Sequence, residues 1–229
     1  MNEIIHYQQS GNVATITLDD GKVNVLSHDI WDALEQAFDR AQESGSAVVL
    51  RGREGQFSAG FDLKEMSKGP ANAIALTTRG SKMARRILSF PTPVVGVSTG
   101  NCIAMGAFLM LTCDYRIGVN GSFRVGLNET TIGMTMHHFG IELARYRLPL
   151  NYFNRCVINA ELFTPEGAVM AGFYDVAVAR ESTQASIAAV LATFGKLNFG
   201  AFHATKVKSR SAILGLLDDC IEQDLNFLK

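Results

Sequence analysis

The chain has 229 residues, of which 47% are hydrophobic and 19% are charged, a composition typical of an ordinary globular protein. This length suits one large domain, or one domain with a small appendage. The formal net charge is −1 at pH 7 and no run of five or six basic residues occurs, so a nucleic acid is not expected as a partner. The densest basic cluster contains Lys206, Lys208 and Arg210. We interpret it as a solvated helix face, with a site for an anionic group as the alternative.

Neither a membrane span nor a metal site is predicted. Residues 1–7 are too polar for a signal peptide, and the apolar region 93–119 is interrupted by glycines and charged residues. The four cysteines show no C-x-x-C spacing, and Cys102 and Cys113 lie in apolar sequence, which favours buried free thiols in a reducing cytoplasm. The five histidines lack metal-ligand spacing. We therefore expect a cytoplasmic protein without a metal ion.

Strands and helices alternate in the first half of the sequence, which indicates an α/β fold. Residues 13–18 are β-branched at alternating positions and predict a strand. Ser27 is a plausible N-cap for a helix that has a continuous apolar face and ends near Gly45. Further strands are predicted at 47–51, 94–97 and 115–119, and further helices at 73–90 and 105–112. The helix at 105–112 is apolar on all sides, as expected of a fully buried helix.

From residue 137 onward the sequence pattern is nearly all helical. Helices are predicted at 138–147, 151–158, 165–171 and 181–194, and from about 199 to the end, with a short extended segment at 173–179. No low-complexity linker divides the chain. We place a soft boundary near residue 190, where a helical tail is expected to begin.

Two glycine-containing segments, 55–62 and 100–106, are predicted to be loops that each follow a strand and precede a helix. Residues 58–62 are mostly small, so their backbone can approach a ligand closely. Two such loops can present two backbone N–H groups to one oxygen, and the N-terminus of the helix after the second loop favours negative charge there. The alternative for either loop is a plain turn between a strand and a helix.

The familiar motifs of α/β enzymes are absent. No G-x-G-x-x-G follows a strand, and the sequence contains neither a P-loop nor a G-x-S-x-G elbow. Glu129 is a candidate functional carboxylate because it lies in a mostly apolar context between Gly126 and Gly133. A surface or capping role is the alternative.

Three segments resemble the crotonase superfamily, which is the enoyl-CoA hydratase/isomerase family. They are 55–66 (GQFSAGFDLKEM), 100–117, and 126–129 (GLNE) with Gly133, and their order and spacing agree with that family. The resemblance covers about residues 1–180. It implies an α/β spiral of ββα repeats with a helical C-terminal region, usually assembled as a homotrimer or hexamer. The chain would then divide into a spiral core, 1–190, and a C-terminal helical trimerisation region, 191–229.

By this resemblance, two peptide N–H groups hold the carbonyl oxygen of an acyl-CoA thioester. The first belongs to Phe61 and the second to Met105, with Gly106 adjacent. Many members have a run of glycines at the second position, so the Met105 side chain could narrow the pocket or shift its loop. Lys206 or Lys208 is a candidate contact for a CoA phosphate. The CoA path is expected along segments that contain Lys22, Val23, Val25, Ala59, Gly60, Asp62 and Leu63, and no cofactor beyond the CoA moiety of the substrate is implied.

The resemblance also separates two reactions. The hydratases of this family use two glutamates, and this sequence carries Phe108 at one of those positions and Glu129 at the other. The segment 126–130 (GLNET) is similar to the matching run in mitochondrial-type Δ3,Δ2-enoyl-CoA isomerases, which rely on one glutamate. We therefore predict an enzyme that converts 3-enoyl-CoA to 2-enoyl-CoA with Glu129 as proton shuttle; a hydratase and a catalytically degenerate acyl-CoA binder are the alternatives. His137 and His138 are expected to start the next helix, or alternatively to lie near the acyl pocket.

Overall fold

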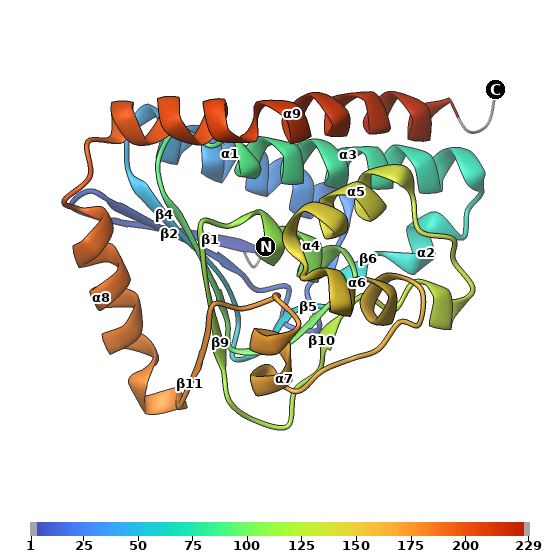
Figure 1. Ribbon diagram of the computed structural model, residues 1–229, viewed down its shortest axis with the longest axis horizontal. Coiled ribbons are helices and arrows are strands. Elements are labelled where there is room, and N and C mark those ends of the chain that lie inside the picture. The colour runs from blue at the N-terminus through green and yellow to red at the C-terminus, as the bar shows by residue number, and fades with distance from the viewer. Residues whose placement is uncertain (1–3, 227–229) are drawn as a thin grey trace.

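A computed structural model describes residues 4–226 (Figure 1). Its largest sheet has six strands in the order β1-β2-β4-β7-β9-β11. Their bounds are β1 Ile5–Ser10, β2 Val13–Leu18, β4 Ala47–Gly52, β7 Val94–Ser98, β9 Tyr115–Val119 and β11 Val176–Val178. Strand β1 is antiparallel to β2, and the other neighbouring pairs are parallel. The four strands predicted in the first half are confirmed, and β1 lies outside the predicted set.

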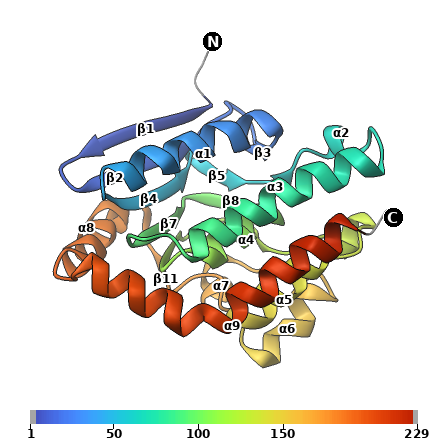
Figure 2. The same cartoon turned by 90° about the horizontal axis from the view of Figure 1, so that it is seen from above.

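Except for α2, which lies outside the predicted set, the helices of the structure confirm the predicted ones to within a few residues, and the predicted end of the last helix at residue 229 lies outside the described residues. Their bounds are α1 His28–Glu43, α2 Leu63–Met66, α3 Pro70–Leu88, α4 Met105–Thr112, α5 His138–Arg147, α6 Leu150–Val157, α7 Pro165–Met170, α8 Thr183–Phe194 and α9 Phe199–Leu225. The hydroxyl of Ser27 accepts a hydrogen bond from Ile30 N and caps α1 as expected. All of α4 is buried, and it forms the centre of the core. Figure 2 shows α1, α3 and α9 running side by side on one face of the molecule.

Two smaller sheets lie beside the large one. Strand β8 (Gly100–Ile103) pairs in parallel with both β5 (Gly55–Ser58) and β10 (Val125–Gly126), and β3 (Val25–Leu26) pairs in parallel with β6 (Gly60–Phe61). The chain passes repeatedly from a strand of the large sheet to a strand of a small sheet and then to a helix, as in β2–β3–α1 and β7–β8–α4. This arrangement is the predicted α/β spiral of ββα repeats.

The prediction that 55–62 and 100–106 are loops is wrong in part, because these segments contain β5, β6 and β8. The strands are short and contain glycine, which is depleted in strands in general. Here, a Cβ on Gly100 would lie only 1.8 Å from the carbonyl carbon of Gly55, its partner in the parallel pairing. Gly100, one of the glycines that suggest a loop, is therefore what allows the two strands to approach and pair.

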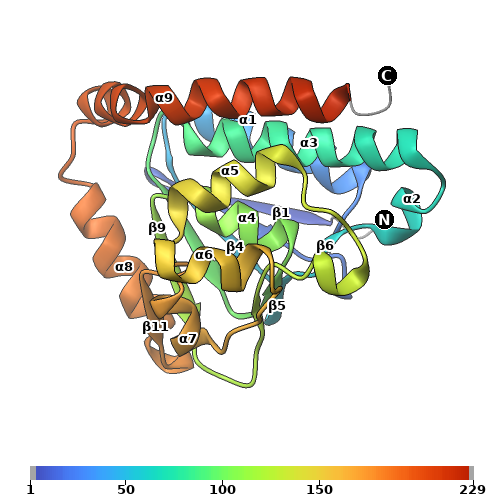
Figure 3. The ribbon, with the colours of Figure 1, turned by 45° about the vertical axis from the view of Figure 1, so that its right-hand side comes forward.

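Helix α9 packs along α3 and α5 of the same chain, as Figures 1 and 3 show. Arg85 of α3 forms a bidentate ion pair with Asp218 of α9, with both N···O distances at 2.9 Å. At the other end, the carboxylate of Asp224 accepts hydrogen bonds from His138 N and Phe139 N and so caps α5. The predicted boundary at residue 190, and a role of 191–229 in trimer formation, stay predictions.

The interpretation of Lys206 and Arg210 as a solvated face is wrong. The side chain of Lys206 is 3% exposed, and its Nζ lies 2.7 Å from Oδ2 of Asp114. Arg210 donates to the other carboxylate oxygen of Asp114 at 3.1 Å. Because Lys206 is buried and paired, it does not reach a CoA phosphate in this arrangement. Lys208 is exposed, so its proposed phosphate contact stays a prediction.

The cysteines are buried free thiols, as expected from their apolar surroundings. Burial raises the pKa of Cys113 to about 12, which keeps this thiol protonated at neutral pH. No single helix within residues 4–226 is both long and apolar enough to cross a membrane, and the pair Arg180–Phe194 and Phe199–Leu225, bent by 93°, meets that test only when the two are joined.

Candidate active site

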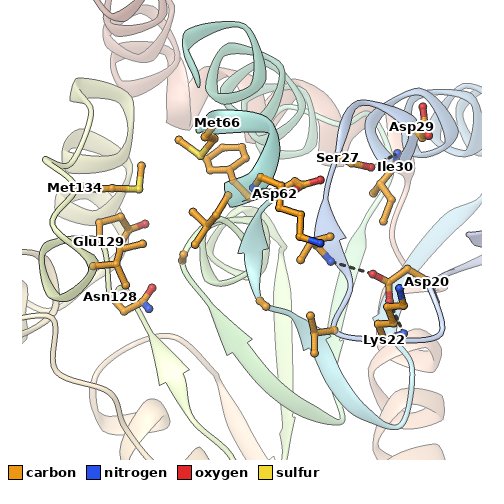
Figure 4. A pocket seen from close by; sticks show the side chains of 18 of the residues that line it. Asp20, Lys22, Ser27, Asp29, Ile30, Asp62, Met66, Asn128, Glu129 and Met134 are labelled. Atoms are coloured by element: carbon orange, nitrogen blue, oxygen red, sulfur yellow. Dashed lines mark hydrogen bonds between the residues drawn. The ribbon is translucent and has the colours of Figure 1, made fainter. Parts of the chain in front are cut away.

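A cavity of about 670 Å³ lies between the β3–β6–α2 region and the segment that follows β10. Figure 4 shows Asn128, Glu129 and Met134 on one wall and Asp20, Lys22 and Ser27 on the other. The side of the cavity between them is formed by Ala59, Phe61, Asp62, Leu63, Lys64, Met66 and Ala104. The predicted oxyanion, base and CoA segments therefore meet around one space.

Strand β6 places the backbone of Phe61 at the cavity. Leu26 and Phe61 are opposite each other in the parallel pairing of β3 and β6, and Asp62 N donates to Leu26 O at 3.3 Å. In a parallel pair of strands, one residue forms hydrogen bonds with the two residues that come before and after its opposite residue. The N–H of that opposite residue then points away from the first strand. The Phe61 N–H therefore points away from β3. The Ser58 hydroxyl, which donates to Asn24 O and accepts from Gly60 N, holds the turn just before it.

The second donor lies at the first turn of α4. The first helical hydrogen bond runs from Phe108 N to Ala104 O at 3.1 Å, so the N–H of Met105 has no partner within the helix. Ala104 has φ of +52°, a region that L-residues rarely adopt and that costs about 1–3 kcal/mol. A Cβ on Gly60 would lie 2.8 Å from Cβ of Ala104 and 3.4 Å from Met105 N. The two segments that carry the predicted donors are thus in direct contact.

The Met105 side chain does not narrow the cavity. It is fully buried and is not among the residues that line the cavity, whereas the neighbouring Ala104 is. Gly106 is also buried, and a Cβ there would lie 2.7 Å from Cβ of Ser58. The methionine at position 105 therefore packs beneath the cavity and leaves the cavity itself open.

Glu129 is a buried carboxylate on the wall opposite these donors. The residue is 9% exposed, and within the described part of the chain its Oε2 has no hydrogen-bond partner. Burial raises the pKa of Glu129 to about 7, while the backbone N–H groups of Glu129 and Asn128 act in the opposite direction. Its backbone carbonyl accepts from Met134 N at 2.9 Å and holds the segment in place. The alternative of a surface glutamate is therefore wrong; Glu129 occupies the N-cap position of the short 3-10 helix Thr130–Ile132, but its side chain makes no capping hydrogen bond.

The other carboxylates around the cavity are occupied or exposed. Asp20 accepts hydrogen bonds from three backbone N–H groups of its own turn, and Asp62 caps α2. Asp29 is exposed. Among the carboxylates that line the cavity within residues 4–226, Glu129 is the one that is both buried and free of a partner at one oxygen. A perturbed pKa in a cavity marks a candidate catalytic group.

The position expected to hold a second glutamate in hydratases contains an apolar side chain in this chain. Phe108 is 1% exposed on α4, and its ring meets the ring of His137 edge to face at a centroid distance of 6.1 Å. His137 directly precedes α5 and His138 is its first residue, so the prediction that these histidines start the helix is confirmed. Neither Phe108 nor His137 lines the cavity.

Comparison with known proteins agrees with this geometry. The model of the enoyl-CoA hydratase/isomerase family matches residues 8–210. The chain belongs to this family. A crystal structure of an enoyl-CoA hydratase/isomerase family protein from Pseudomonas syringae is 48% identical, with a TM-score of 0.97 over 99% of this chain and 98% of that one.

Two curated relatives have different activities in their names. The human mitochondrial enoyl-CoA delta isomerase 1 is 26% identical over 91% of this chain and 71% of its own length. A probable enoyl-CoA hydratase of Bacillus subtilis is 30% identical over 58% of this chain and 54% of its own length. The similarity establishes an enzyme family that acts on enoyl-CoA substrates, and both activities occur among the relatives.

Most of the residues predicted for this member of the enoyl-CoA hydratase/isomerase family meet at the cavity. Those that line it are Lys22, Val23, Val25, Ala59, Phe61, Asp62, Leu63 and Glu129. Gly60, Met105 and Gly106 are buried just behind its surface. Asn128, Ile132 and Met134, which are not among the predicted site residues, also line the cavity. All three lie within five residues of Glu129 in the chain, and this proximity is the sequence signal that can identify them.

Proposed function

We propose that the protein isomerises 3-enoyl-CoA to 2-enoyl-CoA. The substrate thioester carbonyl lies between the Phe61 and Met105 N–H groups, and Glu129 faces the carbon chain from the opposite wall. The observation that carries this proposal is Glu129, a buried carboxylate with an unpaired oxygen in a cavity that offers no second buried carboxylate within residues 4–226.

The reaction needs one proton to move. Glu129 removes a proton from C2 of the 3-enoyl thioester, and the electron pair of that C–H bond passes to the carbonyl oxygen, forming a dienolate. The two backbone N–H groups stabilise this oxygen; losing one such donor typically costs about 3 kcal/mol. Glu129 then returns the proton to C4, which leaves the double bond between C2 and C3. A carboxylate with a pKa near 7 suits both steps, because it accepts the proton and releases it again at neutral pH.

Isomerisation fits this site better than hydration. Addition of water requires one group to orient and deprotonate water while a proton is delivered to carbon. Phe108 offers no group for this, since its ring is buried against His137. Hydration is retained as a second candidate because Asn128 Oδ1, a buried acceptor without a partner in the described residues, lies beside Glu129 and also lines the cavity. A pair of acceptors can hold a water molecule.

A catalytically degenerate acyl-CoA binder is a third candidate. The presence of Glu129 speaks against it, because a binding protein gains nothing from a buried carboxylate whose charged form is destabilised. The expected substrate is an acyl-CoA thioester, with no cofactor beyond its CoA moiety, and a homotrimer or hexamer in the cytoplasm is the expected form of the protein. Lys22 and Lys208 are exposed cations that we propose as candidates to meet the CoA phosphates.

A spectrophotometric assay with 3-enoyl-CoA and 2-enoyl-CoA separates the three candidates as isomerisation, hydration, or binding without turnover. We expect Glu129→Gln to lower kcat for isomerisation by about 10²–10⁴-fold, because it removes the proton shuttle and keeps the shape of the side chain. Glu142→Gln, which neutralises a carboxylate on α5 that does not line the cavity, is the matched control and should retain wild-type kcat. Full isomerase turnover in Glu129→Gln would contradict the assignment.

A further inference from the structure

One buried residue of α3, Gly80, meets the side chains of both proposed oxyanion donors. A Cβ at this position would lie 2.7 Å from Cε1 and from Cζ of Phe61, and 3.3 Å from Cε of Met105. Such distances are shorter than ordinary van der Waals contacts. The Phe61 ring and the Met105 methyl group therefore fill the space that the Cβ of any other residue would occupy.

Both side chains are held by packing against neighbouring residues. The Phe61 ring also packs edge to face against Trp31 of α1, with the ring centroids 6.3 Å apart, and Met105 is fully buried. Their backbone N–H groups belong to segments that contact each other at the cavity, as the approach of Gly60 to Met105 N shows. Movement of either side chain against α3 would therefore shift the N–H group attached to it.

Helix α3 is itself held on both sides. The guanidinium of Arg79 donates to Asp32 of α1 at 2.6 Å, and Arg85 pairs with Asp218 of α9. Residue 80 lies between these two contacts in the sequence. The backbone at Gly80 thus has little freedom to retreat from an added methyl group, and the Phe61 and Met105 side chains would have to move instead.

We propose that Gly80 is a positioning residue for the oxyanion hole. Because Gly80 has no Cβ, the Phe61 ring and the Met105 methyl group can occupy this space, which sets where the Phe61 and Met105 N–H groups stand and allows a methionine at position 105. The inference rests on the proposed function, since the two N–H groups are oxyanion donors only if a thioester enolate forms there.

The variant Gly80→Ala tests this proposal. We expect kcat for 3-enoyl-CoA isomerisation to fall about tenfold to hundredfold, because small misplacements of catalytic groups have effects of that size. KM should stay within about threefold, because a donor that acts chiefly in the transition state contributes little to substrate binding. A merely structural role of Gly80 would lower the melting temperature and leave kcat of the folded enzyme unchanged.

Gly140→Ala is the matched control. Gly140 lies in α5, and its Cβ would meet Met136 Sδ at 2.8 Å, His137 Cε1 at 2.9 Å and Phe108 Cζ at 3.0 Å. These contacts are about as short as those at Gly80, but none of these atoms belongs to a proposed donor residue. We expect a comparable loss of thermal stability with a kcat that is affected much less. An equal loss of kcat in the two variants would overturn the proposal.

Rescue provides the second test. Leucine lacks the Cε1 and Cζ atoms that approach Gly80, so Gly80→Ala combined with Phe61→Leu should regain kcat several-fold over Gly80→Ala alone. Additive losses in the double variant would contradict the steric coupling. If Gly80→Ala does not fold, Phe61→Leu alone still tests the idea, because emptying this space should lower kcat about tenfold with KM nearly unchanged; an unchanged kcat would overturn it.

A readout without turnover separates this inference from the proposed function. Acetoacetyl-CoA is a β-keto thioester whose enolate absorbs in the ultraviolet, and an oxyanion hole increases the enolate fraction of the bound ligand. We expect that fraction to fall in Gly80→Ala and to remain at the wild-type value in Gly140→Ala. A wild-type chain that stabilises the enolate without isomerising 3-enoyl-CoA would contradict the proposed function alone, whereas an unchanged enolate fraction in Gly80→Ala would overturn the role of Gly80.

Discussion

Two buried carboxylates, at the C-terminal end of α4 and at the end of β10, have opposite surroundings. Asp114 accepts hydrogen bonds from Lys206, Arg210 and the backbone N–H of Val94, and its side chain is 6% exposed. Glu129 is similarly buried, but one of its oxygens has no partner within the described residues.

The difference separates a fully paired carboxylate from the one proposed as the catalytic base. The negative charge of Asp114 is compensated by two cations, Lys206 and Arg210, and these ion pairs are part of the contact between α9 and the core. At Glu129 the cost of burial is not offset, and it appears as a pKa of about 7. A sequence shows two acidic residues, and their surroundings in the fold make them chemically different.

The largest effect on stability is expected from Asp114→Asn. Removing this charge leaves Lys206 and Arg210 without their carboxylate, and breaking a buried pair in this way typically costs about 3–5 kcal/mol. Glu129→Gln is the matched change and should cost less than about 1 kcal/mol, because it removes a charge that has no compensating partner. Urea unfolding of both variants at pH 7 measures the two values; equal losses would remove the distinction between the sites.

The next largest effect is the change of stability with pH that the Glu129 carboxyl group causes. The pKa of Glu129 is about 7 in the folded chain against 4.5 for the free side chain, so the folded state binds more protons between these values. The contribution of the protonated carboxyl is fully present below pH 4.5 and is lost as the pH rises through 7. The loss corresponds to about 3 kcal/mol.

The wild-type chain compared with Glu129→Gln isolates this contribution from other titrating groups. The free energy of unfolding of the variant relative to wild type should rise from pH 4.5 to 7 and then level off above pH 8. A difference that is constant across this range would show that Glu129 has an ordinary pKa.

A smaller loss is expected from Lys206→Met. Asp114 then keeps Arg210 and the Val94 N–H as partners, so the variant loses one charged hydrogen bond, worth about 1.5–3 kcal/mol. Urea unfolding measures the loss, and kcat should not change because Lys206 does not line the proposed site. Wild-type stability in this variant would show that Arg210 alone compensates Asp114.

The smallest effect is the pH profile of activity. The proposed base must be deprotonated, so kcat/KM should fall about tenfold for each pH unit below an apparent pKa near 7, which corresponds to about 1.4 kcal/mol per unit. Initial rates between pH 5 and 9 give this profile. An inflection near 4.5 would mean that the substrate-free cavity solvates Glu129 fully.

The sequence predicted the fold well where periodicity dominates. The helix with Ser27 as N-cap and the fully apolar helix 105–112 follow from local patterns, and so do the strands β2, β4, β7 and β9 of the large sheet. Strands β5 and β8 could not be predicted in this way, because the close approach of Gly55 to Gly100 is a tertiary requirement that outweighs strand preference.

The site was predicted in part for similar reasons. Glu129 could be singled out because a carboxylate in apolar sequence is unusual. The direction of the Met105 side chain depends on the absence of a Cβ at Gly80, which lies on another helix. The burial of Lys206 depends on Asp114, which is 92 residues away in the chain. Pairings across such separations leave no periodic signal in a single sequence.

The cap that Asp224 places on α5 has a practical consequence for anyone who shortens this chain. Near the end of α9, Asp224 accepts hydrogen bonds from two backbone N–H groups of α5. A deletion that removes Asp224 leaves these two donors without acceptors and lowers the free energy of unfolding by about 1 kcal/mol. Helix α5 directly follows the segment that holds Glu129, and the damage would therefore begin at the active-site wall, far from the cut in sequence. A truncation series should keep Asp224.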